Sequence, residues 1–476
     1  MPKRPDNWVS ASVIFSIPGL SEQGLQGLKG TLTLKKRKPR AFVFSYDLGD
    51  EYVCAFKIVD GYVKVPRAFG LDYAEKHGIK LTDRRSEGQA IDIKFNEELQ
   101  ASRPELKVKQ DGVVADVVQG LLHRRENAGI LQAATGSGKT PMGIKVACEL
   151  GRSTLIVVNS EFAMDQWRDR LLQFSDIKKE DIGYIRQEKC ELDKPVVIGM
   201  IQTLIRREYE GGDRKSFGLI IFDECHHLPA PDFSQAIFKF DAKYLLGLSA
   251  TPSRSDGLDD ILFFALGSVL NQDVIAIQLV PDVYMIRNML SIPESVYSFP
   301  VRYGGSYCRK ANLGKLINAL VKVEARNDRI AKVTADAAKK DRKVMVFSDR
   351  IRHLEGIKRR LDLELGESFS TLFIGGLTEK EREAAKKVPV MLCTYSYAAE
   401  ALDVPDRDCL ILATPKSRVK QVLGRILRGG QNKKTPLVID FMDQGVKPFE
   451  VMAISRTREY RSIRAKLHLP GGEERR

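Results

Sequence analysis

Two series of short apolar segments, each alternating with helix-like stretches, constrain the fold of this 476-residue chain more than any other feature. Strands that alternate with helices favour a mostly parallel sheet covered by helices, because parallel strands need crossover connections. We therefore expect an α/β protein with two parallel-sheet domains in tandem. The first series is Ile130-Leu131, Leu155–Val158, Val196–Gly199, Leu219–Phe222 and Leu245–Leu248. The second series is Val344–Phe347, Ser370–Ile374, Val390–Cys393, Cys409–Leu412 and Leu437–Phe441.

The segments outside the two series suggest the domain limits. Residues 1–102 contain short alternating strands and turn residues such as Asp60-Gly61, which predict β-hairpins and a small β-rich accessory domain. The strands expected there are Thr31–Leu34, Ala41–Phe44, Tyr52–Ile58 and Tyr62–Val65. Residues 276–310 are rich in proline and glycine and are interpreted as a linker. The parallel-sheet domains are then expected at 103–275 and 311–476.

The charge balance favours a polyanionic partner. The formal net charge is +14, and residues 411–476 alone carry an excess of nine cations. Such a balance is typical of nucleic-acid binding, although a solvated basic surface has the same composition. Two segments are candidate contacts to nucleic-acid phosphates: the run Lys36, Arg37 and Lys38, and the C-terminal segment Arg456–Arg464.

A glycine-rich loop follows the first strand of the first series and precedes a helix. This context is typical of a phosphate-binding loop, in which backbone N–H groups and the helix N-terminus face an anion. Lys139 would place a charge at the β- and γ-phosphates, and the Thr140 hydroxyl would bind Mg²⁺. The loop consists of Ala133, Ala134, Thr135, Gly136, Ser137, Gly138, Lys139 and Thr140.

An acidic pair ends another apolar strand of the same series. Asp223 and Glu224 follow Leu219–Phe222, where Asp223 can hold Mg²⁺ and Glu224 can polarise an attacking water as a general base. His226 would couple this site to its neighbour. A zinc site at Cys225-His226-His227 is not favoured, because no second ligand cluster stands at finger spacing.

These motifs resemble those of superfamily 2 helicases of the DExH type. The phosphate loop, Asp223–His226 and the triplet Ser249, Ala250 and Thr251 are similar to motifs I, II and III. The segment Gln421–Arg428 resembles motif VI, and Thr394–Asp403 resembles motif V. Thr251–Gly257 is similar to a stretch of the XPB-like group, and the chain as a whole resembles phage branch-migration helicases of the UvsW type.

The resemblance implies two RecA-like domains, ATP and Mg²⁺ as cofactors, and roles for further residues. Gln110 and Asp403 would contact the nucleotide, while Gln421, Arg425 and Arg428 would face ATP from the second domain. Arg425 and Arg428 are three residues apart, so a helix puts both on one face, where they can act as arginine fingers. Ser249, Ala250 and Thr251 would couple the ATP site to the nucleic acid. Gln202, Thr203 and Thr394 could donate hydrogen bonds to its phosphates.

The expected function is ATP-dependent remodelling of branched DNA, namely fork regression, Holliday-junction branch migration and duplex unwinding. A DExH RNA helicase is the first alternative, since phosphate contacts do not distinguish DNA from RNA. The motor part of a restriction or nuclease system is another, although no separate nuclease acid cluster is found. A nucleic-acid-binding scaffold with a dispensable ATPase belongs to a different class. The intact set of Lys139, Asp223, Glu224 and Arg425 argues against it.

Composition also bears on where the chain works. No apolar run approaches the roughly 18 residues of a membrane helix. Seven scattered cysteines without a CxxC pair favour reduced thiols in a cytoplasmic protein, in the host cytoplasm if a phage encodes it. We expect a monomer that binds forks or four-way junctions, with other replication or recombination proteins as further partners and no membrane partner.

Overall fold

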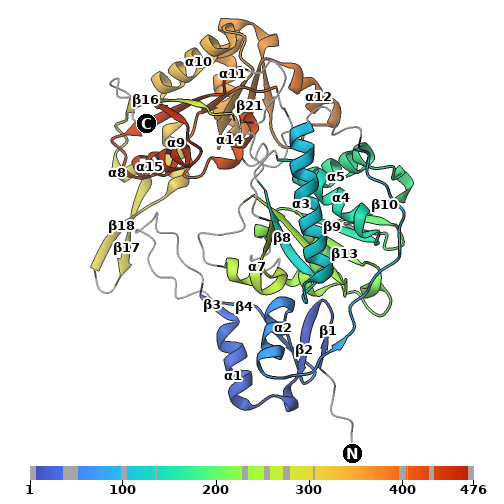
Figure 1. The fold of residues 1–476 in the computed structure, drawn as a ribbon. Coiled ribbons are helices and arrows are strands. Elements are labelled where there is room, and N and C mark those ends of the chain that lie inside the picture. Colours follow the sequence, from blue (N-terminus) through green and yellow to red (C-terminus); the bar gives the residue numbers. More distant parts are fainter. Residues whose placement is uncertain are drawn as a thin grey trace, which may run out of the picture. The chain divides into compact units, whose positions relative to one another are not determined.

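Two compact units divide the described residues, one up to residue 271 and one from residue 279 (Figure 1). The computed structural model describes residues 7–35, 52–97, 104–133, 137–227, 234–250, 258–271, 279–303, 306–395, 404, 406–427 and 434–469. None of the helices in these ranges has both the length and the apolar character needed to cross a bilayer.

The accessory part of the first unit is built on a five-stranded sheet of order β5-β6-β2-β1-β7. The predicted hairpin at Asp60-Gly61 is confirmed, because β5 and β6 pair antiparallel across it. Two helices in this region were not predicted. The strand β3 pairs antiparallel with β4, and the expected strand Ala41–Phe44 lies outside the described residues. The elements are β1 (Trp8–Val9), β2 (Ser12–Ser16), α1 (Glu22–Thr31), β3 (Thr33–Lys35), β4 (Tyr52–Cys54), β5 (Lys57–Val59), β6 (Tyr62–Pro66), α2 (Arg67–Lys76) and β7 (Thr82–Asp83).

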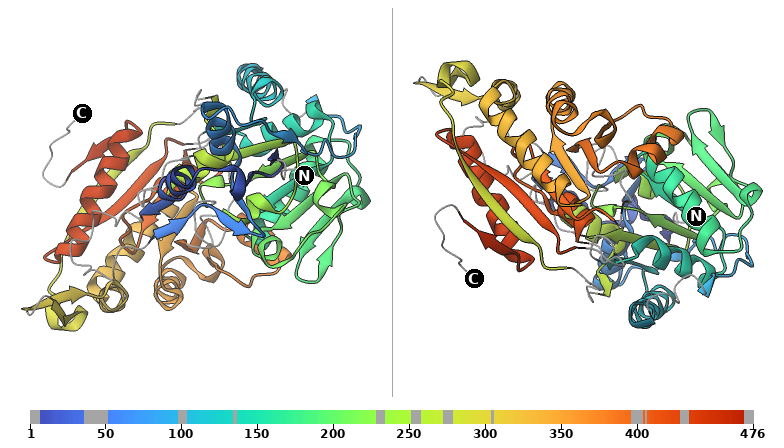
Figure 2. Two further views of the ribbon diagram at one scale, coloured as in Figure 1. Left: turned by 90° about the horizontal axis from the view of Figure 1, so that it is seen from below. Right: turned by 90° about the horizontal axis from the view of Figure 1, so that it is seen from above.

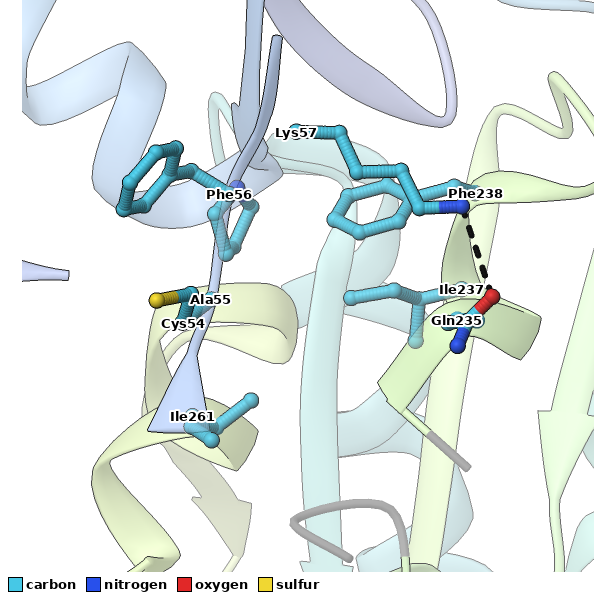
Figure 3. A pocket seen from close by; sticks show the side chains of 9 residues that line it. Cys54, Ala55, Phe56, Lys57, Gln235, Ile237, Phe238 and Ile261 are labelled. Carbon is cyan, nitrogen blue, oxygen red and sulfur yellow. Dashed lines mark hydrogen bonds between the residues drawn. The ribbon is translucent and has the colours of Figure 1, made fainter. Parts of the chain in front are cut away.

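The accessory sheet shares its core with the first parallel-sheet domain. Leu258 and Ile261, at the start of α7 (Asp259–Leu266), are buried in the accessory core. The guanidinium of Arg67 is buried and donates to the carbonyl oxygens of Ala242 at 2.6 Å and Lys243 at 2.8 Å. A cavity of about 90 Å³ remains at this junction, where Lys57 donates to Gln235 at 3.3 Å (Figure 3). The two parts therefore fold as one body.

The first parallel-sheet domain, which we term domain 1, has an eight-stranded sheet of order β11-β10-β12-β9-β13-β14-β8-β15. The five predicted strands are confirmed as β8, β9, β12, β13 and β14, and they are parallel to one another. The strands are β8 (Ala128–Gln132), β9 (Thr154–Val158), β10 (Ile182–Arg186), β11 (Lys189–Cys190), β12 (Val196–Met200), β13 (Leu219–Phe222), β14 (Tyr244–Ser249) and β15 (Val269–Asn271). The helices besides α7 are α3 (Pro104–His123), α4 (Lys139–Leu150), α5 (Glu161–Phe174) and α6 (Ile201–Arg206). Parallel strands place their carboxyl ends at one edge, so the loops after β8, β13 and β14 lie together.

The second unit, which we term domain 2, contains a seven-stranded parallel sheet of order β20-β21-β19-β22-β23-β16-β24. All five predicted strands of the second series are present, and the expected fold class with tandem parallel-sheet domains is confirmed. The strands are β16 (Asp282–Met289), β19 (Val344–Ser348), β20 (Ser370–Phe373), β21 (Val390–Thr394), β22 (Cys409–Leu412), β23 (Leu437–Gln444) and β24 (Lys466–His468). The helices are α8 (Glu294–Tyr297), α9 (Leu313–Leu320), α10 (Glu324–Lys339), α11 (Ile351–Leu365), α12 (Glu379–Lys387), α14 (Lys420–Ile426) and α15 (Lys447–Ser462).

One interpretation of domain 2 needs correction, and the structure limits a second one to fewer residues. Residues 276–310, taken as a linker, supply β16 to the sheet and most of the hairpin of β17 (Ser298–Tyr303) and β18 (Ser306–Ala311). The strand was not predicted because prolines stand at both ends of it.

The segment Arg456–Arg464 was a candidate phosphate contact, with a solvated helix as the alternative. The helix α15 lies along β23 (Figure 2) and buries Arg456 and Tyr460. Arg458, Arg461 and Arg464 are exposed, so a phosphate contact stays a prediction for these three. Arg456 and Tyr460 both bond Asp440 inside the domain.

Candidate ATP site

The phosphate loop stands where the sequence predicts it, between β8 and α4. Lys139 and Thr140 are the first two residues of α4, and Gly138 precedes them with φ of 89°. A side chain at Gly138 would be strained there, and its Cβ would lie 2.3 Å from Nε2 of Gln110. Ser137 is buried, and within the described part of the chain its hydroxyl has no hydrogen-bond partner. Ala134, Thr135 and Gly136 lie outside the described residues.

The acidic pair lies at the carboxyl end of β13 and faces the first residue of α4. Nζ of Lys139 is 3.3 Å from Oε1 of Glu224, so the loop and the acidic pair form one site. Glu224 has φ of 44°, a left-handed backbone conformation that few non-glycine residues adopt. Such a conformation is often found where a side chain must point into a functional site.

The two carboxyl groups have pKa values shifted in opposite directions. Burial and the neighbouring Glu224 charge raise the pKa of Asp223 to about 6. Burial acts to raise the pKa of Glu224 as well, but the Lys139 ammonium and the hydrogen bond from His226 together hold it below its usual value. Two titratable groups with separated pKa values at one strand end are typical of a site of chemistry rather than a structural cap.

A chain of contacts joins the acidic pair to the end of β14. Nδ1 of His226 lies 3.3 Å from Oε2 of Glu224 and 3.4 Å from the hydroxyl of Ser249. Ser249 is fully buried, and its carbonyl oxygen accepts from the backbone N–H of Ala133 at 3.1 Å. The structure thus brings together the ends of β8, β13 and β14, as the three motifs require. Ala250 follows Ser249 directly, and Thr251 lies outside the described residues.

Gln110 is positioned from α3 against the phosphate loop. Its Nε2 donates to the carbonyl oxygen of Ser137 at 2.8 Å, and its side chain is buried. The amide therefore supports the backbone of Ser137. Its expected contact to a nucleotide base stays a prediction.

Residues that could hold Mg²⁺ are Thr140 and Asp223. A hydroxyl and a carboxylate are the oxygen ligands that Mg²⁺ prefers, and few are needed because the ion keeps several waters and phosphate oxygens. The buried Ser137 hydroxyl, three residues before Thr140, has no hydrogen-bond partner among the described residues and could donate to a phosphate oxygen. The donor set therefore fits Mg²⁺ with a nucleotide phosphate.

The remaining candidates lie in separate parts of the chain. Gln202 and Thr203 are in α6 of domain 1, and Nε2 of Gln202 donates to the carbonyl oxygen of Asn159 at 3.0 Å. Thr394 ends β21 of domain 2, and Gln421 and the buried Arg425 are in α14. The roles of these residues stay predictions. Lys36, Arg37, Lys38, Asp403 and Arg428 lie outside the described residues.

One residue of the site was not identified from the sequence. Trp167 in α5 is buried, and its indole N–H donates to Oδ2 of Asp223 at 2.9 Å. Its helical spacing with Met164 and Leu171 is also that of a core residue, and all three side chains belong to the core of domain 1. A buried indole N–H needs a hydrogen-bond acceptor, and this requirement could have indicated that Trp167 contacts a polar residue of the site.

Comparisons with known proteins find relatives among helicases and subunits of restriction enzymes. Residues 103–254 match the family described as the res subunit of type III restriction enzymes. A protein of Acanthamoeba polyphaga mimivirus, named as an ATP-dependent RNA helicase, is 27% identical over 92% of this chain and 81% of its own length. A fragment of an HsdR subunit of a type I restriction enzyme from Vibrio vulnificus has 19% identity and a TM-score of 0.50, over 71% of this chain and 64% of its own. The crystal structure of T4 UvsW aligns over 98% of this chain and 99% of its own, with 17% identity and a TM-score of 0.35.

The motifs and the relatives point to one class of protein. The motifs of this chain resemble those of superfamily 2 helicases, and in particular the UvsW-type and XPB-like members. The mimivirus relative is itself named as an ATP-dependent helicase.

Proposed function

We propose that the chain uses ATP hydrolysis to remodel branched DNA, by fork regression, branch migration and duplex unwinding. The observation that carries the ATP-driven part is the continuous contact from Lys139 through Glu224 and His226 to Ser249. The DNA part rests on the resemblance of Thr251–Gly257 and of the whole chain to UvsW-type and XPB-like proteins. The net charge of +14 supports a nucleic-acid partner of either kind.

The Lys139–Glu224 ion pair explains how hydrolysis would depend on nucleotide. The Lys139 ammonium neutralises the Glu224 carboxylate and keeps its basicity low. When a phosphate draws Lys139 away, Glu224 regains basicity and can accept a proton from the attacking water. Bound Mg²⁺ would supply charge neutralisation of the phosphates, with Asp223 and Thr140 as its protein ligands.

Two further steps complete the proposed cycle. Arg425 and Arg428 would stabilise the charge that develops on the γ-phosphate, which is the role of arginine fingers. The change at Glu224 would reach the nucleic acid through His226 and Ser249. Gln202, Thr203 and Thr394 would hold its backbone without reading sequence.

An ATPase panel tests the substrate. We expect hydrolysis to be stimulated most by a fork or a four-way junction, less by duplex or single-stranded DNA, and least by RNA. Lys139→Ala is the control that must abolish every signal. Equal stimulation by linear and branched DNA would remove branch specificity, and strand-displacement assays on the same substrates would then separate unwinding from translocation.

An RNA helicase is the second candidate, because the mimivirus relative is named as one. Stimulation mainly by RNA in the same panel would favour it. Unchanged nucleic-acid remodelling by Lys139→Ala would instead favour a scaffold with a dispensable ATPase.

The accessory domain is best tested by substitution. Deletion of residues 1–100 would expose Leu258 and Ile261 and remove Glu97, which bonds Lys145 at 2.6 Å, so domain 1 would lose stability. Replacing Lys36, Arg37 and Lys38 with alanine avoids that damage. We expect fork-stimulated hydrolysis to weaken and basal hydrolysis to persist. Alanine at the exposed Lys178, Lys179 and Arg186 removes equal charge elsewhere and serves as the matched control.

A further inference from the structure

We propose that Trp167 is a positioning residue that orients the carboxylate of Asp223 for Mg²⁺. This inference rests on the proposed role of Asp223 as a metal ligand. Trp167 is 1% exposed, and its Nε1–H donates to Oδ2 of Asp223 at 2.9 Å. The other carboxylate oxygen, Oδ1, accepts from the backbone N–H of Glu224 at 3.0 Å. One donor on each oxygen fixes the plane of the carboxylate.

The indole itself is held rigidly. It is packed in the core of domain 1, close to Gly143 of α4. A Cβ added at this glycine would lie only 3.2 Å from Cη2 of Trp167. Leu248, next to Ser249, would lie 3.1 Å from the same Cβ. Trp167 therefore packs against α4, which begins with Lys139, and contacts Asp223 at the end of β13.

This arrangement has a specific physical consequence. Mg²⁺ demands near-ideal octahedral geometry, so a carboxylate that rotates freely must lose that freedom on binding. An outer hydrogen bond that removes the rotation beforehand strengthens metal binding, and loss of such a bond typically weakens it by about 10- to 100-fold. A tryptophan that served only as core filling would not influence Mg²⁺ more than it influences the nucleotide.

Trp167→Phe tests the difference, because it removes the N–H and keeps an aromatic ring. We expect the Mg²⁺ concentration that half-saturates binding of a fluorescent ADP to rise by about 10-fold. ADP affinity in EDTA should change by less than about twofold. Equal losses with and without Mg²⁺ would overturn the proposal, because they indicate a packing defect.

A double-mutant cycle with Asp223→Ala separates this inference from the proposed function. The effect of Trp167→Phe on Mg²⁺ should disappear when Asp223 is already alanine, and a persisting effect would contradict the proposal. If Asp223→Ala alone leaves Mg²⁺ dependence intact, the metal role of Asp223 fails. If Asp223→Ala has the expected effect and Trp167→Phe has none, only the positioning role fails.

A second measurement keeps the test decisive if Trp167→Phe folds poorly. The chain has two tryptophans, so Trp8→Phe leaves a single indole N–H resonance, that of Trp167. We expect this resonance to move when Mg²⁺ and ADP are added, and to move little with ADP in EDTA. A resonance that is unaffected by Mg²⁺ and by Asp223→Ala would overturn the proposal.

Discussion

Each parallel-sheet domain has acidic residues in or directly after one strand of its sheet, but the partners of these acids differ. In domain 2, Asp440 and Asp443 of β23 are 1% exposed, and each accepts two hydrogen bonds from one arginine, Arg456 or Arg326. The Tyr460 hydroxyl also donates to Asp440, and the Asn288 amide also donates to Asp443. In domain 1, Asp223 has one indole and one backbone N–H, and Glu224 has a lysine and a histidine.

The two domains differ in whether the hydrogen-bond donors to the acids can be replaced by another partner. A bidentate arginine pair is fixed and fully charged, and Arg456 and Arg326 each donate a further N–H to a carbonyl oxygen. Lys139 donates to Glu224 through a single ammonium at 3.3 Å, a contact that a phosphate can replace. The partner of such an acid therefore indicates its role: a fixed arginine pair indicates a structural role, and an exchangeable lysine indicates a role in chemistry.

The largest expected effect is on catalysis in domain 1. Glu224→Gln keeps the shape and removes the base, so we expect DNA-stimulated hydrolysis to fall by about 10²- to 10⁴-fold. The midpoint of urea unfolding should stay near that of the wild type, because the side chain is only partly buried. Steady-state ATPase and urea titrations measure both. Hydrolysis near the wild-type rate would contradict the assignment of Glu224 as the base.

The next effect is on the stability of domain 2. Arg456→Met leaves the Asp440 carboxylate buried without its cation, which should cost about 3–5 kcal/mol in the free energy of unfolding. Arg456→Met combined with Asp440→Leu should recover most of that loss, because no unpaired charge remains. Urea unfolding of the wild type, the single variant and the double variant measures both changes in the free energy of unfolding. A loss below about 1 kcal/mol in the single variant would show that the pair is not structural.

The pH dependence of stability sharpens the comparison. The folded chain binds the Asp223 proton more tightly than the unfolded chain, so its free energy of unfolding falls as pH rises from 3.8 to about 6. Asp223→Asn cannot ionise and should be more stable than the wild type above pH 6, by at most about 3 kcal/mol. Thermal unfolding in EDTA at pH 5 and pH 7.5 measures the difference. An advantage of equal size at both values would contradict the raised pKa.

The smallest effect concerns the helix that carries Trp167. Ser160 caps α5 by accepting from the backbone N–H of Ala163 at 3.2 Å. Ser160→Ala should cost about 1 kcal/mol in unfolding free energy and leave ADP affinity unchanged. Thr378→Ala removes the capping box of α12 in domain 2 and is the matched control. A fall in ADP affinity with Ser160→Ala alone would mean that the site depends on the start of α5.

Sequence reasoning located five strands of each sheet, because a buried parallel strand is a continuous apolar run that needs no partner to be recognised. It did not predict the strands β10, β11, β15 and β24, which lie at or near the sheet edges. It missed β16, whose exposed residues Tyr284 and Met289 alternate with buried ones between two prolines. It also missed α1 and α2. The helix α1 has only two apolar side chains, Leu25 and Leu28, and its glycines at 24, 27 and 30 lower the helix propensity of the segment.

The sequence by itself determined the chemistry that is available: a glycine loop before a helix, an acidic pair after a strand, and two arginines at helical spacing. These patterns are local, so a single chain segment contains all the information they need. Tertiary structure decided the partners. The bonds from Trp167 to Asp223, from Lys139 to Glu224 and from Arg456 to Asp440 join residues 56, 85 and 16 positions apart. Chain separation of this kind leaves no periodic trace in the sequence, so only the packed sheets show which acids are free to react and which are held.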